Sequence, residues 1–183
     1  DRTVTATFTL NTYMLSVNRS GTGSGTVNSS PAGINCGTDC SETYNHGTLV
    51  TLTATAATGS IFTGWSGGGC SGTGTCQVTM DMARSVTATF TLRTYPLTVS
   101  KAGTGSGTVS SSPAGIYCGS SCSADFDYNT MVTLTASSAA GSTFAGWSGS
   151  GCSGTGTCRV AMVEARSVTA TFILNTYILT VSK

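Results

Sequence analysis

Short runs in which apolar residues alternate with threonine or serine recur along the chain. The alternation is clear at residues 13–17, 48–55, 60–66, 76–80 and 85–92. Side chains on a β-strand point alternately to opposite faces, so a period of two predicts strands with one buried face. No long window shows the period of a helix. The pattern therefore predicts an all-β protein built from short strands.

Glycine-rich segments separate several of these strands. Residues 21–25 (GTGSG) lie between the strand at 13–17 and a further strand at 26–29, and the same letters return at residues 103–107. Loops of this composition can bind phosphate, but a lysine and a helix then follow the glycines, and neither follows them in this sequence. We therefore expect residues 21–25 to form a hairpin turn between the two strands.

The strand pattern is itself repeated at a period of 82 residues. The segment RTVTATF at residues 2–8 returns as RSVTATF at residues 84–90 and 166–172. Between the two complete copies 54 of 82 positions are identical, without insertion or deletion. Such self-similarity predicts that each copy folds in the same way.

The repeat predicts the division of the chain into four parts. These are residues 1–11 as the last strand of a preceding repeat, residues 12–93 and 94–175 as two repeat modules, and residues 176–183 as the first strand of a following repeat. The chain is then expected to be a piece of a longer array. Links of about two residues between modules should limit flexing.

Eight cysteines follow the same repeat. They are Cys36, Cys40, Cys70 and Cys76 in the first module and Cys118, Cys122, Cys152 and Cys158 in the second. A four-thiolate zinc site is one interpretation, but the wider spacing does not suit a zinc knuckle. Two disulfides per module are favoured, because a small unit without helices has a thin core. Pairing within each close pair is preferred, and cross-pairing between the pairs stays open.

One tryptophan lies in each module, Trp65 in the first and Trp147 in the second, each within a Phe-x-Gly-Trp-Ser-Gly motif. An exposed tryptophan could form a platform for a sugar ring. The alternative is that tryptophan and phenylalanine are the largest core residues of a small sheet unit. Since Phe62 and Trp65 are three positions apart, a regular strand would direct them to opposite faces unless a bulge intervenes at Gly64.

Charged residues are scarce, and their scarcity argues against several classes of function. Only 8% of residues are charged and the net charge is +1, against about 25% charged residues in an average domain. Nucleic-acid binding is not expected from this balance, and no apolar run is long enough to insert into a membrane. The single histidine, His46, is replaced by Tyr128 in the second copy, and acidic residues do not repeat. The sequence therefore predicts no enzyme, no cofactor and no metal site.

Several motifs together resemble a known family. They are GxGxV, SPAGIxCGxxC, FxGWSG, CSGTGTCxVxM and VTATF, and they recur in both copies. The combination resembles the divergent internalin-B-type B-repeat modules of bacterial secreted and cell-surface proteins. That resemblance implies small sheet-rich modules arranged in arrays on exported proteins, and it implies no catalytic residues. The expected fold is a tandem of small antiparallel β-sheet modules, either β-sandwich or β-grasp-like.

The function expected from the sequence is structural. We expect a repeat segment of a bacterial extracellular or cell-surface protein, such as a stalk, a filament or the spacer of an adhesin. Its expected partners are neighbouring copies of the repeat or other subunits of a fibre, joined by strand exchange. The alternative is a carbohydrate- or surface-binding module that uses exposed aromatic residues, with surface glycans as partners.

Overall fold

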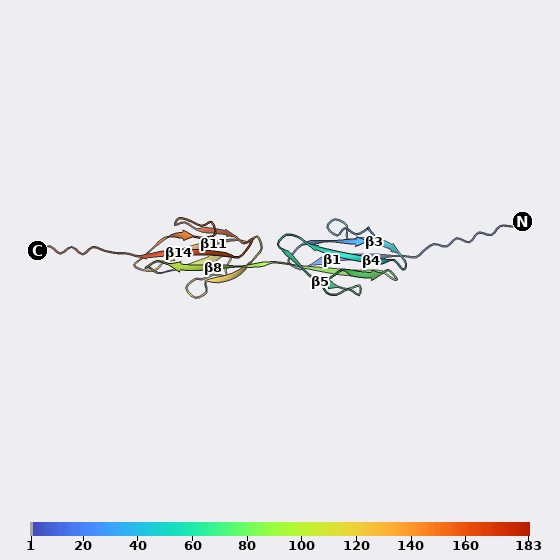
Figure 1. The fold of residues 1–183 in the computed structure, drawn as a ribbon, viewed down its shortest axis with the longest axis horizontal. Helices are drawn as coiled ribbons and strands as arrows, with labels where there is room; N and C mark the ends of the chain where they lie inside the picture. The colour runs from blue at the N-terminus through green and yellow to red at the C-terminus, as the bar shows by residue number, and fades with distance from the viewer. Residues whose placement is uncertain (1) are drawn as a thin grey trace. The chain divides into compact units, whose positions relative to one another are not determined.

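Two compact units, which divide between Arg93 and Thr94, make up the chain (Figure 1). The structure is a computed structural model that describes residues 2–183. Within these residues every regular element is a strand. The prediction of an all-β protein is therefore confirmed.

Each unit contains seven strands in the same order. The first unit holds β1 (Thr12–Ser20), β2 (Gly25–Ser30), β3 (Ser41–Asn45), β4 (Leu49–Ala56), β5 (Ser60–Ser66), β6 (Cys76–Thr79) and β7 (Arg84–Leu92). The second unit holds β8 (Thr94–Ala102), β9 (Gly107–Ser112), β10 (Ser123–Asp127), β11 (Met131–Ser138), β12 (Ser142–Ser148), β13 (Cys158–Ala161) and β14 (Arg166–Leu174). The 82-residue repeat thus appears in the structure strand by strand.

The strands of each unit form two sheets that pack as a β-sandwich. In the first unit the four-stranded sheet has the order β3-β1-β7-β5 and the three-stranded sheet has the order β2-β4-β6. The second unit has the same two sheets, with the orders β10-β8-β14-β12 and β13-β11-β9. Of the two architectures that the sequence allowed, the sandwich is the one observed.

The sheets are antiparallel, as expected, except at one pair of strands in each unit. The first and last strands, β1 and β7, run parallel over six residue pairs, from Leu15–Arg84 to Ser20–Thr89. β8 and β14 pair in the same way over the equivalent residues. Parallel neighbours require a long crossover connection, and here the rest of the unit provides it.

The prediction of a hairpin turn at residues 21–25 is wrong. β1 belongs to the four-stranded sheet and β2 to the other, so this segment crosses from one layer of the sandwich to the other. The crossing brings the backbone against β7, because a Cβ on Gly21 would lie 2.0 Å from the carbonyl oxygen of Phe90. At Gly25 a Cβ would lie 2.3 Å from the Phe90 ring. The glycines are therefore needed because the backbone passes close to Phe90, and not because the segment forms a tight turn.

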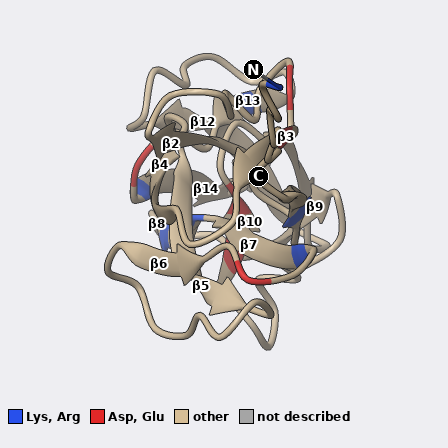
Figure 2. Cartoon of the chain, turned by 90° about the vertical axis from the view of Figure 1, so that its right-hand side faces the viewer, with Lys and Arg blue, Asp and Glu red and all other residues tan. Residues whose placement is uncertain are grey.

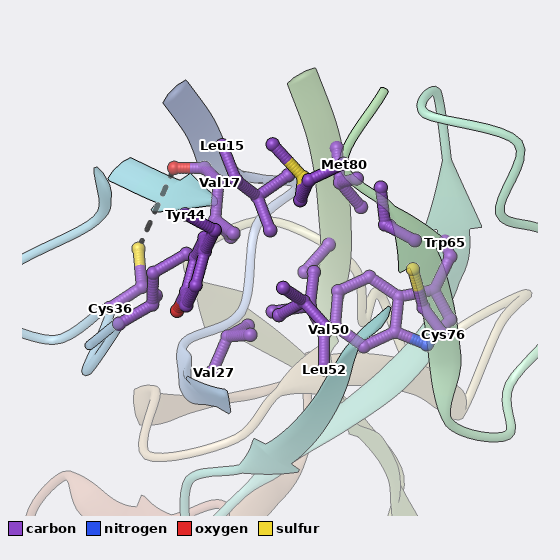
Figure 3. Packing of buried hydrophobic residues seen from close by; sticks show 14 of the residues in the cluster. Leu15, Val17, Val27, Cys36, Tyr44, Val50, Leu52, Trp65, Cys76 and Met80 are labelled. Atoms are coloured by element: carbon purple, nitrogen blue, oxygen red, sulfur yellow. Dashed lines mark hydrogen bonds between the residues drawn. The ribbon is translucent and has the colours of Figure 1, made fainter. Parts of the chain in front are cut away.

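The core of each unit lies between the two sheets. Figure 3 shows side chains from both sheets of the first unit meeting there, among them Leu15 from β1 and Val50 and Leu52 from β4. The period of two along β4 directs Val50 and Leu52 inward, whereas Leu49 is 51% exposed. Fifteen buried residues form this cluster, and the equivalent fifteen form the core of the second unit.

A β-bulge resolves the orientation of the aromatic pair on β5. The register of β5 on β7 shifts between Phe62 and Gly64. The extra residue turns Trp65 to the same face as Phe62, and their rings meet edge to face with centroids 4.9 Å apart. Trp65 is 5% exposed and lies in the core. The same bulge and ring geometry occur at Phe144 and Trp147.

The segments on either side of the two sandwiches carry strand-like sequences but lie outside the sheets. Residues 2–11 and 175–183 are not part of any strand. In the first of these segments Val4 and Phe8 are each 92% exposed. The assignment of the two terminal segments to neighbouring repeats stays a prediction. So does the division of the chain into four parts at 11/12, 93/94 and 175/176.

The position of Tyr44 is occupied by Phe126 in the second unit, and this difference allows the contribution of one hydroxyl group to stability to be tested. The Tyr44 hydroxyl lies 2.8 Å from Ser29 Oγ and donates to the Pro31 carbonyl at 3.3 Å, whereas the second unit has Phe126 at this position. Tyr44→Phe should cost about 1 kcal/mol of stability, because Ser29 keeps its own bond to Pro31. Urea unfolding of the first unit would measure it. A loss above about 3 kcal/mol would contradict this account of the hydroxyl.

Candidate functional site

All eight cysteines are joined in disulfides within the close pairs. The bonds are Cys36–Cys40, Cys70–Cys76, Cys118–Cys122 and Cys152–Cys158. Two disulfides per repeat therefore occur, as expected for the fold. Among residues 2–183 there is no group of three or more His, Cys, Asp or Glu arranged to hold a metal ion.

The first disulfide loop of each unit covers the outer edge of the three-stranded sheet. Cys36 N donates to the Val27 carbonyl at 2.7 Å, and Ser29 N donates to the Ile34 carbonyl at 3.1 Å. These bonds use backbone groups of β2 that would otherwise face solvent. The second unit repeats them between Cys118 and Val109. Because an open strand edge can pair with another chain, the loop acts as a cap on β2.

The second disulfide loop of each unit covers the outer edge of the four-stranded sheet. Trp65 N on the outermost strand β5 donates to the Gly72 carbonyl at 2.9 Å, and the indole Nε1 donates to the Gly74 carbonyl at 2.6 Å. Trp147 makes the equivalent bonds to Gly154 and Gly156. Each tryptophan is thus fixed between the core and the second disulfide loop.

This placement corrects the interpretation of Trp65 and Trp147 as possible ligand-binding residues. Both are 5% exposed, and the only polar atom of each indole is already hydrogen-bonded within its own unit. The bulge at Gly64 is the physical reason, because it turns the ring inward where a regular strand would expose it. A sugar platform requires an exposed ring face, which these two residues do not offer.

Removing a disulfide loop should have two separable effects. The paired substitution Cys36→Ala with Cys40→Ala should cost about 2 kcal/mol, since the closed ring is small. It should also loosen the cap on β2 and increase self-association at high concentration. Urea unfolding measures the first effect and sedimentation velocity the second. Val78→Ala, which weakens the core of the same unit on β6, at the opposite edge of this sheet from the loop, is the control; equal association in both variants would contradict the cap.

Charged side chains are few (Figure 2), and the two ion pairs among the described residues both lie at the surface. Arg84 Nη2 donates to Asp81 Oδ1 at 2.7 Å, and this hydrogen bond holds the pKa of Asp81 below its usual value. Any stabilisation from the pair is therefore present above the ordinary carboxyl pKa and is lost as the pH falls through the lowered pKa of Asp81. The pair is exposed, so the effect on stability is small.

The same ion pair exists in the second unit with a different acid. Val163 replaces Asp81, but Glu164 Oε1 lies 3.0 Å from Arg166 Nη1. Comparison of aligned positions suggested that acidic residues do not repeat. The ion pair is nevertheless kept, because an acid one position further along the chain reaches the equivalent arginine.

His46 and Tyr128 occupy equivalent places in the two units. The centroids of the His46 and Tyr13 rings are 6.0 Å apart, and Tyr128 lies beside Tyr95 in the same way.

An open hollow of about 500 Å³ lies beside the end of β1, where β3 no longer pairs with it. Arg19 is its charged lining residue, and Arg19 Nη1 donates to the Gly25 carbonyl at 2.8 Å. In the second unit Lys101 Nζ donates to the equivalent Gly107 carbonyl at 3.1 Å. Both copies thus have a cationic side chain that hydrogen-bonds from the first strand of the unit, β1 or β8, to the first residue of the next strand.

The features that recur in both units are therefore structural: a two-layer core, two capped edges and a parallel pair of terminal strands. A comparison with protein families matches the chain twice, at residues 13–94 and 95–176, to the divergent InlB B-repeat domain. The chain belongs to this family. The resemblance found from the sequence motifs is confirmed, and each unit is one B-repeat domain. No curated protein sequence matches the chain.

Solved structures resemble the tandem B-repeats at low sequence identity. The Bacillus anthracis TIE protein matches with a TM-score of 0.52 and 8% identity, over 89% of this chain and 34% of that protein's chain. The major pilin protein T-13 of Streptococcus pyogenes matches with a TM-score of 0.40 and 11% identity, over 91% of this chain and 98% of the pilin. The minor pilin GBS52 of Streptococcus agalactiae matches with a TM-score of 0.34 and 8% identity, over 93% and 100%. The likeness to the TIE protein is one of fold.

The parallel pair of terminal strands is the main feature of the fold that sequence reasoning missed. Its members lie at opposite ends of each repeat, so no local pattern joins them. The sequence did show that each copy begins and ends on a strand with an apolar face, but it did not show that these two strands pair. Two such strands have to be buried somewhere in the sheet, and pairing them with each other closes the unit.

Proposed function

We propose that the chain is a structural spacer in a bacterial extracellular or cell-surface protein, as part of a stalk, a filament or an adhesin. The observation that carries the proposal is the parallel pairing of the first and last strands in each unit. Parallel strands begin at the same end of a sheet, so the chain enters a unit at one end and leaves it at the other (Figure 1). A module of this kind adds length with every copy.

The added length follows from the register. β1 begins three residues before its first pair with β7, and β7 continues three residues beyond the last of the six pairs. At about 3.3 Å per residue one unit spans roughly 36 Å between the points where the chain enters and leaves. Copies that are identical at 54 of 82 positions, without insertion or deletion, would repeat this step regularly.

The composition supports an extracellular location. Eight cysteines, all in disulfides, are typical of proteins in oxidising compartments. None of the elements described for residues 2–183 is a helix long and apolar enough to cross a membrane. Membership of the B-repeat family supports the tandem arrangement.

Strand exchange is the finer part of the proposal. Residues 2–8 match residues 84–90 of β7 except that Thr3 replaces Ser85, and they lie outside any sheet, with Val4 and Phe8 exposed. We infer that such a segment pairs with a neighbouring repeat or with another subunit of a fibre, and so buries its apolar face. In each unit the strand with this sequence pairs with the first strand on one side and with β5 or β12 on the other, so the segment would take the place of β7 in a neighbouring repeat or subunit that lacks its own last strand.

Arrays of two, four and six copies would test the spacer. Small-angle scattering should give a maximum dimension that grows by a constant increment per copy, and immunogold labelling should place the parent protein outside the cell. A dimension that stays constant beyond two copies would overturn the proposal. A glycan array with the two-copy chain tests the alternative of carbohydrate binding; for that alternative the buried tryptophans provide no support.

A further inference from the structure

We propose that the parallel terminal strands of each unit form a force-bearing clamp, so that the repeat resists unfolding when the chain is pulled from its two ends. The inference deepens the spacer function and rests on it for its biological meaning. The clamp itself is a property of the folded unit and can be measured in solution. It concerns β1 with β7 in the first unit and β8 with β14 in the second.

The direction of force relative to the strands is the basis of the inference. Tension along the chain pulls β1 toward its first residue, Thr12, and pulls β7 toward its last residue, Leu92. Because the two strands are parallel and adjacent, these opposed forces act along the strands and shear the six paired residues against one another. Inter-strand hydrogen bonds loaded in shear share the force and must break together, whereas bonds at the end of an antiparallel pair open one after another.

Side chains on both faces reinforce the same pair. On the outer face Asn18 Nδ2 donates to Ser85 Oγ at 3.1 Å, and Ser20 Oγ lies 3.0 Å from Thr89 Oγ1. On the inner face Val17 is 3% exposed and Val86 is fully buried. Sliding one strand by a single residue would therefore expose these valines and break the hydroxyl contacts.

The neighbouring strands keep either end of the clamp from peeling. The first residues of β1 pair with β3, from Thr12–Asn45 to Ser16–Ser41. The last residues of β7 pair with β5, from Ser66–Thr87 to Ser60–Leu92. Each end of the clamp is thus tied to an outer strand of the same sheet before the load reaches the six pairs.

The disulfides lie outside this path of force. Each joins two cysteines that are four or six positions apart and that lie between the terminal strands in the sequence. A closed loop can shorten the chain that is released after the clamp breaks, but it cannot join β1 to β7. Unfolding of one unit with its disulfides intact should release roughly 22 nm of chain, and reduction should add about 2.5 nm.

Pulling one unit in two directions tests the clamp without altering its contacts. In the full chain, click-chemistry handles at Arg93 and Lys183 load β8 against β14 in shear. Handles at Ala140, which is exposed just before β12, and at Lys183 instead load the Ser142–Leu174 end of the β12–β14 pair and open it residue by residue. Optical-tweezer or atomic-force measurements should give a severalfold higher unfolding force for the first geometry. Equal forces in the two directions would overturn the clamp.

A backbone substitution provides a second readout. Val99 N donates to the Cys122 carbonyl at 2.7 Å, away from β14, so the backbone of the next residue, Ser100, faces β14. Ser100→Pro removes one donor of the clamp and should lower the force in the shear geometry toward the unzipping value. Ser100→Ala keeps the donor and should leave the force unchanged. An unchanged force in Ser100→Pro, or a loss of force on disulfide reduction alone, would contradict the assignment.

The two proposals fail separately. A low shear force in arrays that lengthen regularly and lie outside the cell would overturn the clamp and leave the spacer in place. A high shear force in a chain that is not exposed on cells would leave the clamp and overturn the spacer.

Discussion

Phe90→Ala is expected to destabilise the first unit by about 3 to 5 kcal/mol, because it empties the centre of the core. Phe90 is fully buried, lies against the Phe62 ring with centroids 5.3 Å apart, and is approached by the backbone of Gly25. A small domain has only about 5 to 15 kcal/mol of total stability, so the substitution should bring this unit close to unfolding at room temperature. Guanidinium unfolding followed by tryptophan fluorescence would show the loss.

The chain contains matched controls for this substitution. Phe172→Ala should produce the same loss in the second unit, since Phe172 is equally buried. Phe8→Ala, in the same VTATF sequence, should change stability by less than about 0.5 kcal/mol, because Phe8 is 92% exposed. Each unit has one tryptophan, so each substitution should separate one transition from the other. A comparable loss from Phe8→Ala would show that the segment at residues 2–8 is packed in solution.

Gly21→Ala should cost a similar amount, about 3 to 5 kcal/mol, for a backbone reason. Gly21 has φ +94°, a region that alanine enters only with strain. A Cβ there would also lie 2.0 Å from the Phe90 carbonyl oxygen, which is part of β7 and cannot move without disturbing the sheet. Differential scanning calorimetry should show a large fall in Tm for the first unit. Gly103→Ala should do the same in the second unit, where the Phe172 carbonyl lies 2.0 Å away.

Gly47 separates the effect of φ from the effect of space. It has φ +80°, yet a Cβ there would have no atom within 4 Å. The equivalent residue in the second unit is Asn129, with φ +66°. Gly47→Ala carries the strain of a positive φ without a clash and should cost about 1 to 2 kcal/mol, and Gly47→Asn should cost less, since asparagine tolerates this conformation. If Gly47→Ala and Gly21→Ala were equally destabilising, close packing of the crossing segment against β7 would not be the cause.

The pattern of residues along the chain was sufficient for much of the local structure. The period of two located the strands at residues 48–55, 60–66 and 85–92 to within a residue or two of β4, β5 and β7. The gapless repeat predicted that both units share one fold, and the order of strands in the two sheets is indeed the same in each unit. The close cysteine pairs with small spacers indicated a stapled unit of two disulfides. These properties depend on side-chain alternation and on short loops, so a local sequence is enough to specify them.

The partner of each strand could not be predicted in the same way. Alternation shows that one face of a strand is apolar, but it does not say which strand lies beside it. The glycine-rich segment at residues 21–25 had the composition of a hairpin turn, and only the placement of β1 and β2 in different sheets shows that it crosses between layers. The orientation of Trp65 likewise depended on a bulge set by pairing with β7.

The sequence by itself determined where the strands lie, that the units are alike and that each has two disulfides, because these features arise from residues close together in the chain. Only the tertiary structure decided the parallel pairing of first and last strands, the covering of the sheet edges and the burial of the tryptophans. The VTATF segment illustrates the reason: Phe90 and Phe172 are buried between sheets, whereas Phe8 is exposed. Identical residues differ in this way because burial depends on partners about 70 residues away in the chain, such as β1 for β7.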